Sequence, residues 1–251
     1  MPQTLRHSLR SHIVPRTFER TDAEVLVGGT TSENIDYFDS VIGPAPWVIA
    51  LVLGLTLVFL TIVFRSLVVA ATSVLLNLLS VGAAYGLLVL VFQDGFAAGI
   101  FGFHQVDTIE AWVPLFLFSV LFGLSMDYQV FLLSRIKERY DELRAHGGPD
   151  DGDRTTQAVV FGVASTARII TGAALIIVAV FAGFASGELI MFQQMGFGVA
   201  VALLIDATII RSVVLPATMH LLGRWNWYLP RWLNWLPRVQ IEAPAAAAAS
   251  R

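Results

Sequence analysis

The sequence contains no cysteine and few charged residues. The absence of cysteine excludes disulfide bonds, thiolate metal sites and cysteine nucleophiles. Charged side chains make up 14% of the 251 residues, whereas a soluble domain has about 25%. With 56% hydrophobic residues and a mean hydropathy of +0.70, the composition is that of a membrane protein. We expect it in the cell (inner or plasma) membrane.

The charge and histidine content exclude two further classes of site. A net charge of −3 is small and indicates no nucleic-acid partner. The five histidines are scattered, and none pairs with another at the spacing of metal ligands. We therefore expect no metal site and no cofactor.

Five apolar runs are long enough to cross a bilayer, which needs about 20 residues each. They predict an all-α, polytopic membrane protein with a five-helix transmembrane bundle. Only Arg65 and Ser66 separate the first two runs, so these runs must form an antiparallel hairpin. Pro216 is expected to kink the end of the last run. The predicted spans are 46–64, 67–92, 113–135, 162–185 and 193–221.

The connections between the spans indicate their orientation. The 135–157 connection carries five Lys and Arg residues, whereas the 93–112 connection carries none. Because cytoplasmic loops are enriched in Lys and Arg, we expect the N-terminus outside and the C-terminus inside. The acidic stretch GGPDDGD at 147–153 is expected to be a flexible cytoplasmic linker.

The spans divide the chain into an extracytoplasmic tail (1–45), a membrane domain (46–223) and a cytoplasmic tail (224–251). The first tail predicts a strand at EVLV, a Gly-Gly turn and a helix capped near Thr31 or Ser32. This is the pattern of a short α+β remnant of a larger domain. Nothing before the first span is apolar enough to export the tail, so we expect that the chain lacks an N-terminal portion.

An aspartate, Asp127, interrupts the third apolar run. A charge at membrane depth costs roughly 2.5–3.5 kcal/mol on insertion scales, so such a carboxylate is expected to have a function. Gly123, one turn earlier, would let another helix approach closely. We therefore expect Asp127 to point into the bundle, with Tyr128 lining the same cavity.

Charged and polar residues also occur in the other runs. Asp206 and Arg211 share the last span, and Arg168 lies in the fourth. The acid and base of the last span are either functional or a buried ion pair that fixes packing, and the arginines alternatively anchor the spans at the surface. Asn77 predicts a hydrogen bond between helices, and Gly82 with Gly86 predicts close helix packing.

The run GLSMDYQVFLLSRIKERYDE, residues 123–142, closely resembles the Gly-x-Ser-x-Asp-Tyr…Phe-Leu-x-x-Arg signature of the MMPL family within the RND transporter superfamily. Segments 168–184 and 196–230 look like the two helices that end such proteins. The resemblance covers roughly residues 22–236. It implies the last five spans of the second of two pseudo-repeated halves.

The resemblance also implies a function. Family members export lipids or other hydrophobic compounds with the proton-motive force, and each half contributes an Asp-Tyr pair to a proton relay. Asp127 and Tyr128 match that pair, and Asp206 with Arg211 match the charges of the final span. Ser125 and Arg168 are expected to line the cavity or join the relay. The expected partners are membrane lipids, protons, and the missing N-terminal half or an identical copy.

Other functions remain open at this point. A non-transporting lipid-sensing or scaffold bundle, or an inactive remnant of a transporter, fits the same five spans. Two membrane aspartates could also belong to an intramembrane aspartyl protease. Those enzymes carry Tyr-Asp and Gly-x-Gly-Asp, whereas this chain has Asp-Tyr at 127–128 and Leu-Ile-Asp at 204–206. We therefore do not expect an enzyme.

Overall fold

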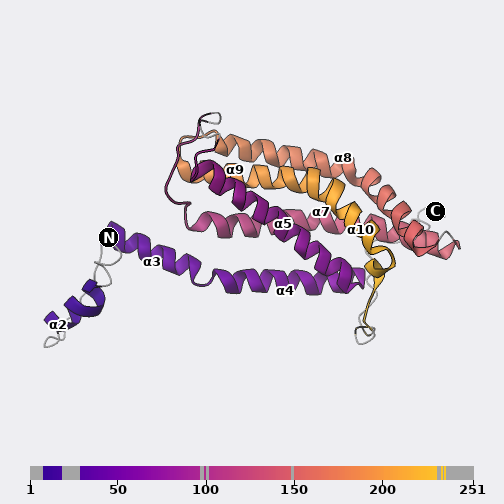
Figure 1. The fold of residues 1–251 in the computed structure, drawn as a ribbon, viewed down its shortest axis with the longest axis horizontal. Helices are drawn as coiled ribbons and strands as arrows, with labels where there is room; N and C mark the ends of the chain where they lie inside the picture. The colour runs from indigo at the N-terminus through magenta and orange to yellow at the C-terminus, as the bar shows by residue number, and fades with distance from the viewer. Residues whose placement is uncertain are drawn as a thin grey trace, which may run out of the picture. The chain divides into compact units, whose positions relative to one another are not determined.

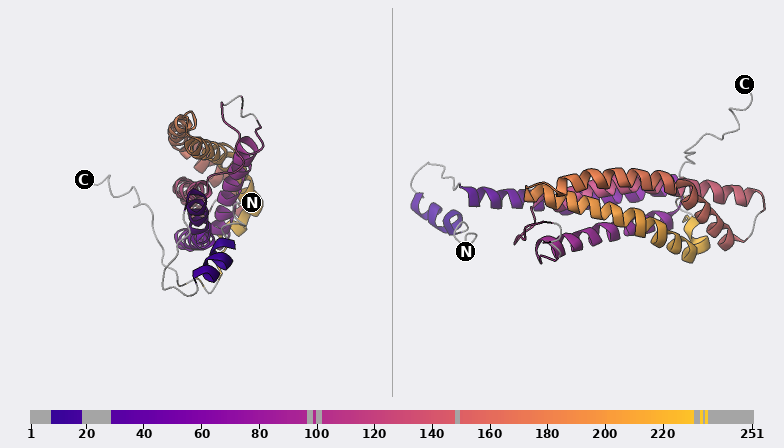
Figure 2. Two further views of the ribbon diagram at one scale, coloured as in Figure 1. Left: turned by 90° about the vertical axis from the view of Figure 1, so that its left-hand side faces the viewer. Right: turned by 90° about the horizontal axis from the view of Figure 1, so that it is seen from above.

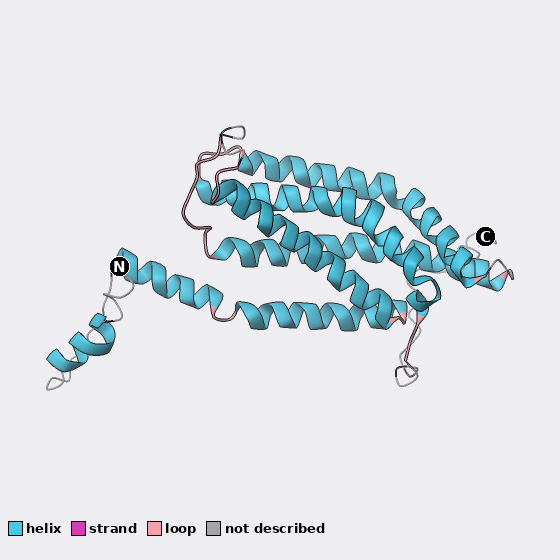
Figure 3. Ribbon diagram, viewed as in Figure 1, coloured by secondary structure: helices cyan, strands magenta, loops and turns pink. Residues whose placement is uncertain are grey.

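The computed structural model describes residues 8–18, 29–96, 99, 102–147, 150–230, 233 and 235. Every regular element in these residues is a helix (Figure 3). The chain divides into two units, Met1–Ile49 and Ala50–Arg251. The predicted strand at 24–27 lies outside the described residues.

The first unit contains the π-helix η1 (Leu9–Ile13), α2 (Val14–Phe18) and α3 (Thr30–Ile42). Its longest helix begins at Thr30, directly after Gly29, whose φ is 109°. That backbone conformation favours glycine because a Cβ would clash there. The predicted cap at Thr31 or Ser32 is therefore wrong, since the helix begins before either residue.

Within the described residues, five helical stretches are long and apolar enough to cross a membrane, which agrees with the predicted number of spans. They cover residues 36–64, 67–92, 112–145, 152–185 and 190–227. The helices of the spans are α4 (Ala45–Phe64), α5 (Leu67–Phe92), α7 (Trp112–Ala145), α8 (Asp151–Ala185) and α9 (Ile190–Ile205), the last followed by η2 (Asp206–Val214), α10 (Leu215–Leu222) and η3 (Gly223–Trp227).

The turn between α4 and α5 is tight and attached to the end of the last span. Arg65 has a φ of 49°, which reverses the chain within two residues. The Ser66 hydroxyl caps α5 by accepting a hydrogen bond from the Val69 amide at 3.1 Å. The same hydroxyl donates to the Asn226 carbonyl of η3 at 2.5 Å. These bonds fix the beginning of α5 against η3.

Helices α7 and α8 are longer than the apolar runs that predicted them. The ends that their connection joins, pink to salmon, project at the right of the right-hand view in Figure 2. The end of α7 is amphiphilic and carries exposed ion pairs, such as Lys137 with Asp141 at 2.9 Å. Helix α8 already begins at Asp151, so the predicted flexible linker at 147–153 is helical in its second half. Opposite charges spaced three or four residues apart stabilise such solvated helix ends.

Helices α5, α7 and α9 pack together, and α8 lies along both α7 and α9 (Figure 1). Close packing occurs at Gly196 on α9, where a Cβ would lie 2.5 Å from the Ala185 nitrogen of α8. At Gly162 of α8 it would lie 2.4 Å from an Ile136 side-chain carbon of α7. By contrast, Gly82 and Gly86 are exposed with nothing near them, so the close packing predicted there is absent from the described contacts.

The last span changes its helical form at its centre. Helix α9 continues into the π-helix η2, and η2 into α10, whose first turn contains Pro216. A proline lacks an amide proton and is accommodated best in the first turn of a helix. The irregularity predicted at Pro216 therefore begins ten residues earlier, at Asp206, as a widened helix.

Candidate functional site

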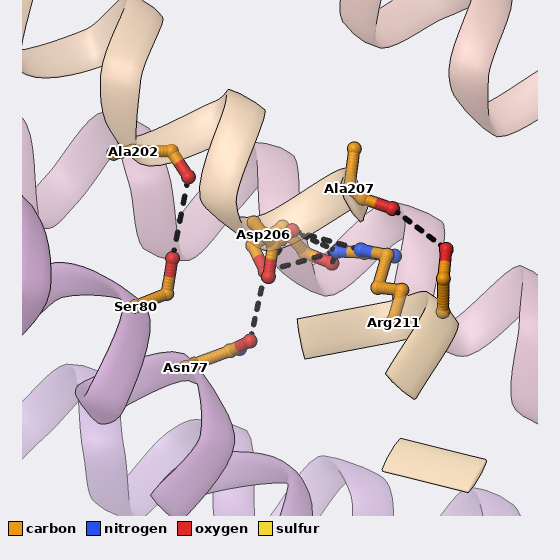
Figure 4. Close-up of polar contacts among 8 residues, drawn as sticks. Asn77, Ser80, Ala202, Asp206, Ala207 and Arg211 are labelled. Carbon is orange, nitrogen blue, oxygen red and sulfur yellow. Dashed lines mark hydrogen bonds and ion pairs between the residues drawn. The ribbon is translucent and has the colours of Figure 1, made fainter. Parts of the chain in front are cut away.

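Asp206 and Arg211 form a buried ion pair inside the last span. The Arg211 Nε donates to the Asp206 Oδ2 at 2.8 Å, and Nη2 lies 2.7 Å from the same oxygen (Figure 4). The two residues are 3% and 5% exposed. Such a pair stabilises a fold only weakly, but breaking it leaves an unpaired buried charge.

The π-helix is what brings these two residues together. In an α-helix, residues five apart point about 140° away from each other around the axis. In a π-helix, hydrogen bonds join residues five apart, so residue i+5 points much closer to the direction of residue i than it does in an α-helix. Both residues belong to η2, and its end shows this bonding, because the Leu215 amide donates to the Ile210 carbonyl. The widened turn therefore places acid and base on one face.

Ser125 of α7 joins this pair to a second helix. Its hydroxyl lies 3.0 Å from the Asp206 Oδ2 and accepts a hydrogen bond from the Arg211 Nη2 at 2.9 Å. The same guanidinium nitrogen also donates to the Ser125 backbone carbonyl. Because Ser125 is buried in α7, these bonds fix η2 against that helix.

Asn77 of α5 brings in a third helix. Its Oδ1 lies 2.8 Å from the Ser125 hydroxyl oxygen, which confirms the hydrogen bond between helices that the sequence predicts. A serine hydroxyl has one proton, so it donates to Asn77 or to Asp206 but not to both at once. Asn77 is thus linked to the charged pair through the Ser125 hydroxyl.

Tyr128 connects the buried pair to the face of α7 that carries Asp127. The Arg211 guanidinium carbon lies 5.3 Å from the centre of the Tyr128 ring, within the range of a cation–π interaction. Tyr128 is half-buried and packs against the hydrophobic core. It therefore contacts the arginine of the pair directly.

Asp127 does not point into the bundle, so that prediction is wrong. Its side chain is exposed, and so is Gly123, one turn earlier, where an added Cβ would have nothing within 4 Å. The next residue, Tyr128, turns toward the core because it lies about 100° further round the helix. The Asp127 face of α7 is thus available to a neighbour outside the described residues.

Arg168 does not join the cluster either. It is exposed on α8, whereas the cluster is built from α5, α7 and η2. The structure therefore brings together four residues, Asn77, Ser125, Asp206 and Arg211, with Tyr128 at their edge. Asn77 was missed as a site residue, and only its polarity within an apolar run could have indicated it.

The geometry separates the two aspartates. Asp206 is buried and paired with Arg211, whereas Asp127 is exposed on another helix. The shared proton of an aspartyl protease requires two carboxyl groups in one site. A charged pair stabilised by serine and asparagine is instead typical of polar clusters that respond to protons or ions within membranes.

Comparison with known proteins agrees with the signature around Asp127. The model of the MMPL family matches residues 8–242. The chain belongs to the MMPL family. With five membrane-length apolar helices in the part of the chain that the structure describes, this MMPL chain is a multi-pass protein of the cell membrane in the RND superfamily.

Three relatives show how much of the chain is shared. The heme uptake protein MmpL11 of Mycobacterium tuberculosis is 44% identical over 223 residues, which cover 88% of this chain and 22% of the relative. The mycolic acid-containing lipids exporter MmpL11 of Mycolicibacterium smegmatis is 42% identical over a stretch that covers 89% of this chain and 22% of the relative. The trehalose monomycolate exporter MmpL3 of the same species is 36% identical over a stretch that covers 84% of this chain and 20% of the relative. The chain thus spans about a fifth of the length of these MMPL relatives.

Proposed function

We propose that the chain is the C-terminal membrane part of an exporter of lipids or other hydrophobic compounds, driven by the proton-motive force. It would carry one side of the intramembrane proton relay, formed by Asp127, Tyr128, Asp206 and Arg211. The observation that supports this most strongly is the Asp206–Arg211 pair, buried at the meeting of three helices.

The pair suits a proton-dependent step because of its charge balance. Protonation of Asp206 removes the negative charge and leaves Arg211 buried without a counterion. A buried unpaired charge is strongly unfavourable, so the guanidinium would have to move toward another acceptor. Its contacts with Ser125 and Tyr128 would transmit that movement to α7.

Asp127 would act at the surface of α7 that this chain leaves exposed. A carboxylate is costly against lipid, so we propose that a second membrane element covers it. That element is the other half of the transporter or an identical copy, whose own Asp-Tyr pair would meet Asp127 and Tyr128. The basic ends of α7 and the C-terminal tail would face the cytoplasm, with the first unit outside.

The names of the relatives support a proposal for the cargo class. Their names include a lipid exporter, a trehalose monomycolate exporter and a heme uptake protein. These cargoes share a large apolar surface. We propose a lipid or similarly hydrophobic compound as the cargo of this chain.

A non-transporting lipid-binding role is the second candidate. An apolar groove lies beside α4 at its end near the α5 turn, and such grooves fit acyl chains. It is lined by Leu57, Val58, Thr61, Ile62, Leu67, Leu233 and Trp235. A sensing or scaffold bundle would use this groove without any need for the charged cluster.

One experiment separates the two roles. The protein is reconstituted with the membrane proteins that copurify with it, and movement of a fluorescent lipid is followed under an imposed pH gradient. We expect Asp127→Asn to abolish gradient-driven movement and to leave lipid binding unchanged. Asp141→Asn, an exposed acid on the same helix, is the control. Movement that survives Asp127→Asn would contradict a role of Asp127 in the relay. A wild-type protein that binds lipid without any gradient-driven movement would favour the lipid-binding role.

A further inference from the structure

Helix α5 presents a line of polar side chains to the last span. Ser66, Ser73, Asn77 and Ser80 are separated by seven, four and three residues, so they share one face of the helix. All four are buried. The line covers the first half of α5, although this helix is otherwise among the most apolar of the described helices.

Both ends of this line are bonded to the last span. The Ser80 hydroxyl donates to the Ala202 carbonyl of α9 at 3.4 Å (Figure 4). The Ser66 hydroxyl donates to the Asn226 carbonyl of η3 at 2.5 Å. The two helical segments therefore run antiparallel, and Ser73 and Asn77 lie beside the stretch of the last span that contains η2.

The middle of the line is not satisfied by the protein. Within the described residues, the Ser73 Oγ and the Asn77 Nδ2 are buried without a hydrogen-bond partner. On the facing segment, the Asp206 Oδ1 and the Arg211 Nη1 are also buried without a hydrogen-bond partner among the described residues. An unsatisfied polar atom in a membrane interior is strongly unfavourable, because lipid offers no hydrogen bonds.

The chemistry of these atoms limits what they can bind. The amide and guanidinium nitrogens donate, the carboxylate oxygen accepts, and the serine hydroxyl does either. A ligand that matches all of them must be small, neutral and able to donate and accept. Buried water has these properties and typically makes about three hydrogen bonds to groups of this kind.

We propose that ordered water occupies the space between α5 and η2, held by Ser73, Asn77, Asp206 and Arg211. Ser73 lies one turn from Asn77 toward the α4–α5 turn, so the water extends from the charged pair toward that end of the bundle. The same water would also be the path by which a proton reaches Asp206, and this part of the inference rests on the proposed function. Transfer of a proton from a hydronium ion to the Asp206 carboxylate would give a neutral carboxylic acid and one water molecule.

Water-edited solid-state NMR tests the hydration without any transport assay. The full chain is prepared in lipid bilayers with 15N-labelled asparagine, and transfer of magnetisation from water to each side-chain amide is timed. Asn226 is the internal control, because its Nδ2 is equally buried but donates to the Met219 and Gly223 carbonyls at 2.6 and 2.8 Å. We expect transfer to Asn77 to be several-fold faster than transfer to Asn226.

Two serine variants locate the water. Ser73→Ala removes a proposed holder and is expected to slow the transfer to Asn77. Ser80→Ala removes a hydroxyl that already bonds to Ala202, so it should leave the transfer unchanged. Transfer to Asn77 as slow as to Asn226, or insensitive to Ser73→Ala, overturns the proposal. If the proposed function fails instead, the NMR result persists while no variant alters proton uptake.

Discussion

Asp206 and Arg211 pair within one helix although they are five residues apart, because η2 is a π-helix. The widened turn directs both side chains to the buried face, where Ser125 bonds to each of them. The helix geometry and the polar cluster are therefore one feature. Several measurable consequences depend on it.

Removal of either charge of the pair should destabilise the protein. Asp206→Asn leaves Arg211 buried without a counterion, which typically costs about 3–5 kcal/mol. The double variant Asp206→Asn with Arg211→Met should recover part of this loss. The free energy of unfolding in mixed detergent micelles gives the coupling between the two sites.

The exposed pair of Arg135 with Glu138, at 2.8 Å, is the control for that cycle. Solvated pairs contribute about 0–1 kcal/mol, so its coupling should be small. Equal coupling in the buried and exposed pairs would contradict the burial of the charges.

The length of the turn can be tested separately from its chemistry. Deletion of Ala207 places the acid and base four residues apart, the spacing at which an ordinary α-helix aligns side chains. We therefore expect the deletion to keep the ion pair and most of the stability. Insertion of one alanine after Ala207 places them six apart and should cost as much as Asp206→Asn. Thermal unfolding of both variants makes the comparison, and a deletion as damaging as the insertion refutes the role of the π-helix.

The Ser125 hydroxyl should contribute to the stability of the protein through its hydrogen bonds to the charged pair. Ser125→Ala removes hydrogen bonds to charged groups, each worth about 1.5–3 kcal/mol. Ser119→Ala on the same helix is the matched control, because its exposed hydroxyl donates to the Leu115 carbonyl of its own helix. Unfolding measurements should show a clear loss for the first variant and almost none for the second. A similar loss in the free energy of unfolding for both variants would contradict the role of Ser125 in the cluster.

The absence of cysteine makes the proposed orientation easy to test. Thr108→Cys and Ala145→Cys place single thiols at exposed positions in the connections at opposite ends of the spans. In intact cells, a membrane-impermeant maleimide should label the first variant at once. The second should react only after the membrane is permeabilised. The reverse order of labelling would show that the N-terminus lies inside.

The sequence alone predicts the spans well because their signal is strong. Apolar runs of sufficient length, the two-residue turn at Arg65 and Ser66, and the Asp-Tyr signature need no knowledge of packing. The polarity of Asn77 likewise predicts its bond to another helix. These features follow from the cost of burying charged and polar groups in lipid. The order of apolar and polar residues along the chain therefore reveals them directly.

The arrangement around the charges could not be predicted in the same way. The spans are apolar on every side, so periodicity does not tell which face of α7 is covered, and the prediction that Asp127 points inward is wrong. The π-helix depends on a shift in backbone hydrogen bonding that hydropathy does not record. Close packing at Gly162 and Gly196, in place of Gly82 and Gly86, depends on which helices are neighbours.

The central claim is that Asp206, paired with Arg211, takes part in moving protons. The most direct measurement is proton uptake into proteoliposomes, followed with an internal pH-sensitive dye under an imposed membrane potential. The protein is reconstituted with its copurifying partners, and Asp206→Asn is compared with Asp141→Asn. The account predicts that uptake is lost in the first variant and unchanged in the second. Uptake that continues at the wild-type rate in a folded Asp206→Asn protein would contradict it.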